Sequence, residues 1–302
     1  MTAPRPVFPG QFLMISRRCT QRQFLLRPDE DTRQNFAYCL AEAAARFDIT
    51  VVLSQMEANH HHTLVYDSHG RDVEFREHFH KMVAKAQNAR RGRWENLWAS
   101  VEPSVVVVSP DDVLEKLVYI ATNPVKDELV ERVHQWPGPR FVQALLSGRA
   151  MTIKRPRFFF SKKGKMPAEV RLQLKLPDHF EGKVELLAAL QRRIAEVEEE
   201  CRADRIQNGR RLLGRARVLR QWWGERPSGR EPRRGLNPRV AVRDKWLRIK
   251  TLQRNAEWQA EYREAYKAMR AGLSYAFPYG TYWFRRFANA VVKSPPLPVT
   301  TV

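Results

Sequence analysis

The sequence predicts an α+β protein in which helices cover one face of a small antiparallel sheet, followed by a mostly helical, basic C-terminal region. Two observations lead to this prediction. Strand and helix patterns follow one another in the order β-α-β-β-α-β-α over the first half of the 302-residue chain. Beyond Gly148 the sequence becomes basic and long helical patterns dominate. A chain of this length suits about two domains, so we expect one over residues 1–148 and a second over residues 149–302.

The elements of the first domain follow from local patterns. β-branched and aromatic runs predict four strands, at residues 11–20, 49–57, 60–67 and 104–108. Helical spacing of apolar residues predicts three helices, at Asp31–Phe47, 71–90 and 109–123. Acidic residues open the first helix, where they complement the helix dipole. Ser109 and Pro110 open the third helix as N-cap and first helical residue, and the Asn123-Pro124 pair ends it.

The second domain is predicted to be mainly helical. Residues 152–167 form a basic, aromatic connector that carries a strand. The apolar spacing of residues 183–206 predicts a long helix, and residues 243–272 predict another that ends at Gly272. Between them, residues 224–239 are rich in Gly, Pro and Arg and predict a loop.

Positive charge is concentrated in the second half of the chain. The sequence holds 53 Lys and Arg residues against 33 Asp and Glu, a net charge of +20. Residues 1–150 contribute +1, from 19 basic and 18 acidic residues, and residues 151–302 contribute +19, from 34 and 15. This asymmetry indicates a polyanionic partner. Nucleic acid is favoured over a membrane surface, because no helix pairs a basic face with a clean apolar face.

Secretion and membrane insertion are not expected. The sequence has no run of about 18 uncharged apolar residues, and its first residues lack the basic and apolar blocks of a signal peptide. Cys19, Cys39 and Cys201 are far apart and form no CxxC pair, so a disulfide framework and a thiolate zinc site are both disfavoured. We expect a reducing, cytoplasmic location, associated with the nucleoid.

Three consecutive histidines lie in the strand predicted at residues 60–67. Because side chains alternate across a strand, His60 and His62 project together and His61 projects to the opposite face. Two imidazoles on one strand face can bind a divalent cation if a third ligand is present. By spacing alone, a solvated polar strand edge is the favoured interpretation. His78 and His80 form a second HxH pattern, but on a helix these positions lie on different sides.

Tyr119 and Asn123 share one face of the helix that starts at Ser109, because they are four residues apart. A tyrosine hydroxyl can attack phosphorus when a cation polarises the phosphate. An amide oxygen one turn away could complete the shell of that cation. Taken alone, Tyr119 is better explained as a core tyrosine.

The two patterns together resemble a transposase family. Asn59-His60-His61-His62, followed about 60 residues later by the run Tyr119-Ile120-Ala121-Thr122-Asn123-Pro124-Val125, is similar to the hallmark of the REP-associated tyrosine transposases, which belong to the insertion-sequence-200-like, single-tyrosine HUH transposases. The early strand with Arg17, Arg18 and Gln21 and the Gly92-Arg93-Trp94 loop also suit this family. The resemblance covers about residues 10–140.

The resemblance implies a ferredoxin-like or RRM-like HUH core that cleaves and rejoins single-stranded or hairpin DNA. Tyr119 would be the nucleophile and would form a 5′-phosphotyrosine link. His60, His62 and Asn123 would hold one Mg²⁺ or Mn²⁺. The sequence departs from the family at His61, where a bulky apolar residue is usual, and in residues 151–302, which extend past the catalytic module.

The basic residues provide candidates for DNA binding. Our candidate set combines the early strand, the Gly92 loop and the basic second half: Arg17, Arg18, Arg91, Arg93, Arg210, Arg211, Arg215, Arg233, Arg234, Trp222 and Trp223. The arginines would meet phosphates and the tryptophans would stack on unpaired bases. The alternatives are a solvated basic face and tryptophans that pack between helices.

Other functions stay open on the sequence alone. The chain could be a domesticated relative that binds DNA or RNA without catalysis, since the basic half would suffice for binding. A relaxase or replication-initiation nuclease shares the HUH chemistry, but relaxases usually place the tyrosine before the histidines. Relatives occur as monomers and as homodimers, and we expect one of these states.

Overall fold

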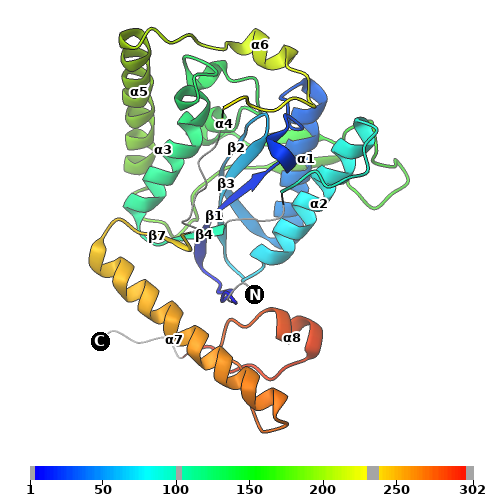
Figure 1. Cartoon of the computed structure of the whole chain (residues 1–302), viewed down its shortest axis with the longest axis vertical. Coiled ribbons are helices and arrows are strands. Elements are labelled where there is room, and N and C mark those ends of the chain that lie inside the picture. Colours follow the sequence, from blue (N-terminus) through cyan, green and yellow to red (C-terminus); the bar gives the residue numbers. More distant parts are fainter. Residues whose placement is uncertain (1–3, 100–103, 230–237, 297–302) are drawn as a thin grey trace.

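A five-stranded sheet forms the centre of the structure (Figure 1). The computed structural model describes residues 4–99, 104–229 and 238–296. The strands are β1 Gln11–Arg18, β2 Ile49–Met56, β3 His60–Asp67, β4 Ser104–Val107 and β7 Val240–Ala241, in the order β2-β3-β1-β4-β7. The strands β1 to β4 pair antiparallel with one another in the order of a ferredoxin-like fold, and β7 pairs parallel with β4 at the edge of the sheet. The predicted α+β class is therefore confirmed.

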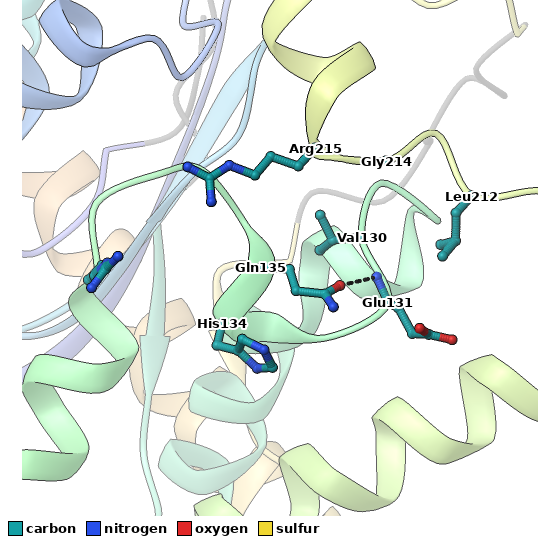
Figure 2. Close-up of a pocket in the computed structure, with 8 residues that line it drawn as sticks. Val130, Glu131, His134, Gln135, Leu212, Gly214 and Arg215 are labelled. Atoms are coloured by element: carbon teal, nitrogen blue, oxygen red, sulfur yellow. Dashed lines mark hydrogen bonds between the residues drawn. The ribbon is translucent and has the colours of Figure 1, made fainter.

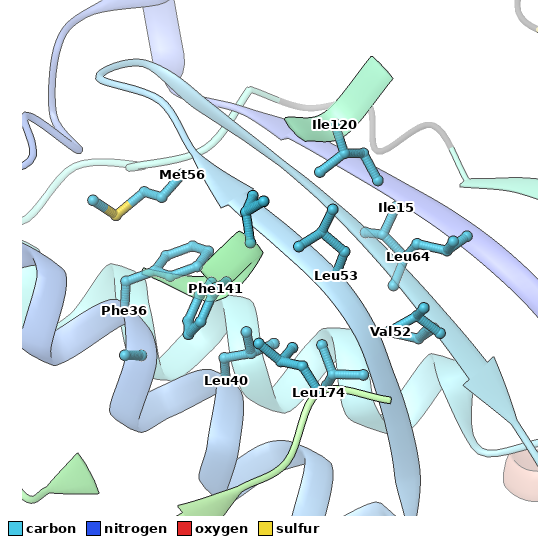
Figure 3. Packing of buried hydrophobic residues seen from close by; sticks show 14 of the residues in the cluster. Ile15, Phe36, Leu40, Val52, Leu53, Met56, Leu64, Ile120, Phe141 and Leu174 are labelled. Carbon is cyan, nitrogen blue, oxygen red and sulfur yellow. The ribbon is translucent and has the colours of Figure 1, made fainter. Parts of the chain in front are cut away.

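Helices lie on both faces of this sheet. The helices α1 Glu30–Phe47 and α2 Asp72–Arg90 cover one face, where Phe36 and Phe79 pack against His61. The helix α3 Pro110–Lys126 lies across the other face, where Tyr119 contacts His62. The prediction that helices cover a single face is thus correct for α1 and α2 and incomplete for α3. Because α3 carries apolar side chains such as Ile120 toward the sheet, it buries the second face as well (Figure 3).

The remaining elements belong mostly to the second half of the chain. The short helices are η1 Thr20–Arg22, η2 Val133–Gln135, α4 Phe141–Ser147, α6 Arg215–Arg220 and α8 Trp283–Ala288. The long helices are α5 Lys183–Gln207 and α7 Lys245–Arg270. The strands β5 Met151–Lys154 and β6 Glu169–Leu172 form a separate two-stranded sheet that packs against α1. None of the helices in the described part of the chain is long and apolar enough to cross a bilayer.

The hydrophobic core contains residues from both sides of the predicted domain boundary at residue 148. One cluster of buried side chains runs from Leu13 to Val218, and Leu190 on α5 belongs to it. Figure 3 shows Phe36 from α1 together with Leu174 from the segment after β6 in this core. The assignment of separate functions to residues 1–148 and 149–302 stays a prediction, but the packing does not divide there.

A second, smaller cluster of buried hydrophobic side chains lies near the C-terminal end of the chain. Ala265 on α7 packs with Phe277 and Ala290 beyond it. The segment before β1 joins this unit to the rest, since the Val7 N–H donates to the Gly280 carbonyl at 2.9 Å and Phe8 lies against Tyr279. The start of α7 lies beside β7, whereas its far end extends away from the main sheet (Figure 1).

The helix α3 runs past its predicted end. Ser109 caps its start, where the hydroxyl accepts from the Asp112 N–H at 3.2 Å, as the sequence predicts. Pro124 lies inside the helix, which continues to Lys126. Proline lacks the N–H that would bond the carbonyl four residues earlier, but in the last turn of a helix only this bond is lost.

Candidate active site and nucleic-acid interface

His60 and His62 project from β3 toward α3, as strand alternation predicts. Their rings lie 4.9 Å apart between centroids. The Nδ1 of His60 lies 2.7 Å from the Asn59 Oδ1, and the Nδ1 of His62 lies 2.7 Å from the Ser16 Oγ on β1. Because the Asn59 side-chain oxygen can only accept, the His60 Nδ1 is the donor in this hydrogen bond. Each Nδ1 is thus held by a neighbour, which is the usual arrangement of histidines that bind a metal through Nε2.

Tyr119 faces His62 from α3. The Tyr119 hydroxyl lies 3.4 Å from the Nε2 of His62. Asn123 follows one turn later and is only 6% exposed. Its Oδ1 is buried and has no hydrogen-bond partner among the described residues. A buried amide oxygen without a partner is unfavourable by about 1–3 kcal/mol, so this atom is a candidate ligand.

These donors fit a divalent cation. The set would comprise the Nε2 atoms of His60 and His62 and the Oδ1 of Asn123. Two imidazoles and an amide oxygen suit first-row divalent metals, with Mn²⁺ somewhat better matched than Mg²⁺. Within the described ranges no group of three or more His, Cys, Asp and Glu side chains has metal-binding geometry, so the amide would be needed to complete the set.

His61 has a structural environment on the opposite face. Its Nε2 lies 2.9 Å from the Nε2 of His80, and its Nδ1 lies 3.0 Å from the Thr63 hydroxyl. Phe36 and Phe79 pack edge-on against its ring. Burial lowers the pKa of His61 well below its ordinary value, and the neighbouring His80 adds to this shift. The unusual histidine of the motif therefore has the polar partners that its buried position requires.

The HxH pattern on α2 is not a ligand pair. The His78 Nε2 lies 2.6 Å from a carboxylate oxygen of Glu42. The His80 side chain contacts His61, and the His80 carbonyl accepts from the Trp98 indole N–H at 2.9 Å. The two side chains thus point to different partners, as helical spacing predicts.

A buried carboxyl group lies next to the histidines and was not among the predicted site residues. Glu57 follows β2, is 1% exposed, and donates its backbone N–H to the His60 carbonyl at 2.8 Å. Neither carboxylate oxygen has a hydrogen-bond partner among the described residues. Burial raises the pKa of Glu57 well above its ordinary value, and the nearby Asp127 at the end of α3 adds to this shift. No local sequence pattern distinguishes Glu57 from a solvated turn residue.

The raised pKa of Glu57 predicts a pH-dependent stability. The folded state keeps the proton, whereas the unfolded chain loses it above a pH of about 4.3. Stability from this group is therefore fully present below that pH and is lost as the pH rises toward the folded pKa. We therefore expect Glu57→Gln, which carries no ionisable group, to raise the free energy of unfolding at pH 8 above that of the wild type. Urea unfolding measures it.

The difference in free energy of unfolding between Glu57→Gln and the wild type should vanish at pH 4. An exposed carboxyl on α5, away from the start of the helix, supplies the control, because Glu200→Gln should leave stability unchanged at both pH values. A Glu57→Gln variant that is less stable than the wild type at pH 8 would show that the ionised carboxylate is favourable in the folded protein.

The predicted phosphate-binding residues of β1 separate onto two faces. Arg18 pairs in register with His60 and is exposed on the side of the candidate site. Arg17 pairs with His61, on the side of α1 and α2. Arg18 is therefore the one of the two that lies next to the histidines.

The Gly92 loop and the Trp222-Trp223 pair form one surface. Arg91 and Arg93 lie over the Trp223 ring, 5.2 and 5.8 Å from its centroid. Burial lowers the pKa of Arg91 to about 10, and its guanidinium lies 3.9 Å from Asp29. Arg91 thus holds Trp223 in place. Trp222 is 58% exposed and Trp94, which we did not include in the set, is 92% exposed.

This surface combines both halves of the chain. The Phe24 N–H donates to the Glu225 carbonyl at 2.9 Å, and the Arg27 guanidinium donates to the Gln221 carbonyl at 3.0 Å. The segment around Trp222 is thereby fixed against the loop after β1. Sequence separation of about two hundred residues hides such a contact from local patterns.

The other basic candidates come from the segment after α5. Arg210 already pairs with Glu128 at 2.7 Å and with Asp204, whereas Arg211 is exposed. Arg215 borders a 460 Å³ hollow next to His134 (Figure 2). Arg233 and Arg234 lie outside the described residues.

Comparisons with known proteins find likeness only among solved structures. No protein-family model matches the chain, and no curated protein matches it. One similar structure is a REP-associated tyrosine transposase bound to a REP hairpin, with a TM-score of 0.42 and 15% identity over 53% of this chain and 92% of that chain. Another is a "putative transposase" from Deinococcus radiodurans R1, with a TM-score of 0.28 and 14% identity over 38% of this chain and 93% of that chain. The two solved structures to which we compare this chain are thus transposases, one of them a REP-associated tyrosine transposase.

Proposed function

We propose that the chain is a single-tyrosine HUH transposase that cleaves and rejoins single-stranded or hairpin DNA. One observation carries the proposal. The Tyr119 hydroxyl lies 3.4 Å from the Nε2 of His62, and Asn123, one turn later on α3, has a buried Oδ1 without a hydrogen-bond partner among the described residues. A nucleophile, two imidazoles and an amide oxygen in one place suit phosphoryl transfer.

The chemistry exchanges one phosphate ester for another. The Tyr119 Oη attacks the scissile phosphorus, the O3′ atom leaves, and the products are a 5′-phosphotyrosine and a free 3′-hydroxyl. The same or another 3′-hydroxyl can attack this linkage and release Tyr119, so the reaction needs no external energy source. His60, His62 and Asn123 would hold a Mg²⁺ or Mn²⁺, whose charge polarises the phosphate.

The basic surfaces would hold the DNA backbone. Arg18 lies next to His60, and Arg91 and Arg93 lie over the Trp223 ring. These arginines would neutralise phosphates. If 5 to 8 cations meet phosphates, log K should fall with log salt at a slope of about −3.5 to −6 on single strands. Trp222 and Trp94 would stack on unpaired bases.

The proposal is tested with a library of single-stranded DNA. The protein is incubated with the library and Mn²⁺, denatured, and the DNA that remains attached is sequenced. We expect covalent adducts that share one cleavage sequence and are lost when EDTA is added. Tight binding without any adduct would instead favour a domesticated protein that binds nucleic acid without cleaving it.

Ser16→Ala should weaken metal binding. The Ser16 hydroxyl is the partner of the His62 Nδ1 and orients that ring. Loss of such a partner typically lowers metal affinity about 10- to 100-fold, which isothermal titration with Mn²⁺ measures. Ser147 on α4 is the control, because its hydroxyl donates to the Ala144 carbonyl at 3.3 Å. Equal Mn²⁺ affinity of Ser16→Ala and Ser147→Ala would exclude His62 as an oriented ligand.

A further inference from the structure

A cavity of 570 Å³ lies against Tyr119 and is built by both halves of the chain. Tyr119 and Lys116 line it from α3, and Val105 lines it from β4. The second half supplies the opposite walls, with Val240 from β7 and Arg248 from α7. Figure 1 shows α3 between α5 and the sheet, with β7 beside β4 and the start of α7 next to it.

The lining combines an apolar floor with cationic walls. The apolar part consists of valines from four elements and the segment after β7: Val105, Val118, Val197, Val240 and Val242. Five basic side chains also border the cavity: Lys116, Lys126, Arg193, Arg243 and Arg248. Two acidic side chains, Asp112 and Glu115, oppose them.

The two carboxylates are already engaged by the protein. Asp112 accepts from the Arg243 backbone N–H at 2.9 Å, and Glu115 pairs with the Arg243 guanidinium at 2.9 Å. Lys116 and Arg248 have no carboxylate within 4 Å among the residues that the structure describes. Lys126 lies 5.9 Å from the centroid of the Tyr119 ring. The cavity therefore has excess positive charge on the side where Tyr119 lies.

We propose that this cavity binds the nucleotide that adjoins the scissile phosphate of a single DNA strand. The inference rests on the proposed function, because it takes Tyr119 as the attacking group. A strand whose phosphate reaches Tyr119 must continue past it, and the cavity shares a wall with that side chain. Its size lies in the range of pockets for small ligands, roughly 300–1,000 Å³. The valines suit a base, and the cations suit the flanking phosphates.

The second half of the chain would then complete the substrate site. The Val106 N–H donates to the Arg239 carbonyl at 3.0 Å, and Asp112 holds the Arg243 backbone. These two bonds fix the β7 wall against β4 and α3. The basic half thus contributes fixed side chains next to Tyr119 in addition to its overall charge.

Paired charge reversals test the cavity in the full-length protein. Lys116→Glu combined with Arg248→Glu removes both unpaired cations. Lys81→Glu combined with Lys85→Glu is the control, because these exposed lysines lie one turn apart on α2, which covers the opposite face of the sheet. Binding of a fluorescent single strand is measured in EDTA, so that no cleavage is needed. We expect the cavity variant to bind at least tenfold more weakly than the control, with a salt slope shallower by about 1.4.

The outcomes separate the cavity from the catalytic proposal. Equal affinity of the cavity and control variants would overturn the cavity, even if the wild type forms adducts. A difference between them in the absence of any adduct would support the cavity as a single-strand site and refute the catalytic proposal. If the reversals unfold the protein, Lys116→Gln with Arg248→Gln is compared with Lys81→Gln with Lys85→Gln, and the same change in slope of about 1.4 is expected with a smaller loss of affinity.

Abasic substrates supply a second readout. Once the cleavage site is known, each base next to the scissile phosphate is removed in turn. One of the two removals should weaken binding to the wild type at least fivefold. The same removal should have less than a twofold effect on Ala241→Trp, which fills the cavity from β7. A full effect in Ala241→Trp, or no effect of either removal in the wild type, would overturn the proposal.

Discussion

Tyr119→Phe is expected to abolish covalent attachment to DNA and to leave DNA affinity within about twofold of the wild type. The substitution removes one oxygen, the atom that would attack phosphorus. The ring keeps its contacts with His62 and Lys126, so α3 should pack unchanged. The measurement is denaturing electrophoresis of labelled single strands with Mn²⁺, alongside a binding titration in EDTA.

Tyr66→Phe is the matched control for the nucleophile. Tyr66 lies four residues beyond His62 on the same strand face, where its ring packs against His179 and Phe12. Its loss should leave adduct formation unchanged. Adducts in Tyr119→Phe, or their loss in Tyr66→Phe alone, would refute the assignment of Tyr119.

Substitutions of the three histidines are expected to distinguish the residues needed for cleavage from the residue needed for stability. His60→Ala and His62→Ala should each lower cleavage about a thousandfold or more, because each removes a ligand for the charge that polarises the phosphate. His61→Ala should lower the free energy of unfolding by about 2–4 kcal/mol, because it leaves a cavity and an unpaired His80 in the core. Folded His61→Ala protein should still cleave DNA.

Cleavage rates and urea unfolding together decide between these roles. Each variant is assayed at a temperature where unfolding shows it to be more than 95% folded. If His61→Ala loses metal-dependent cleavage while its stability equals that of the wild type, the assignment of strand faces to functions is wrong. The assignment would also be wrong if His60→Ala, His61→Ala and His62→Ala lose the same amount of stability and all still cleave DNA.

Local physical rules predicted most of the strands, helices and side-chain directions in the first half of the chain. Alternation along β3 placed His60 and His62 on one face, and helical spacing placed Asn123 one turn after Tyr119. The Ser109-Pro110 pair marked the start of α3, which sets the rotation of that helix over the sheet. These features depend on neighbours within a few residues, so sequence alone carries them.

Features that depend on distant contacts could not be predicted in this way. The strand β7 has only two residues and forms through pairing with β4, more than a hundred residues earlier in the chain. The cavity beside Tyr119 exists only once β7, α5 and α7 are in place. Glu57 is buried by α3 and the loops around it, and nothing in its sequence neighbours indicates that burial.

Peptide mapping of the trapped adduct tests the central claim most directly. After incubation with Mn²⁺ and a single strand, the protein is denatured and digested with trypsin and nuclease. Tyr119 is the only tyrosine in the tryptic peptide of residues 117–126. We predict a nucleotide mass on Tyr119 in this peptide, absent from samples with EDTA. A nucleotide on any other residue, Tyr66 included, would contradict the account.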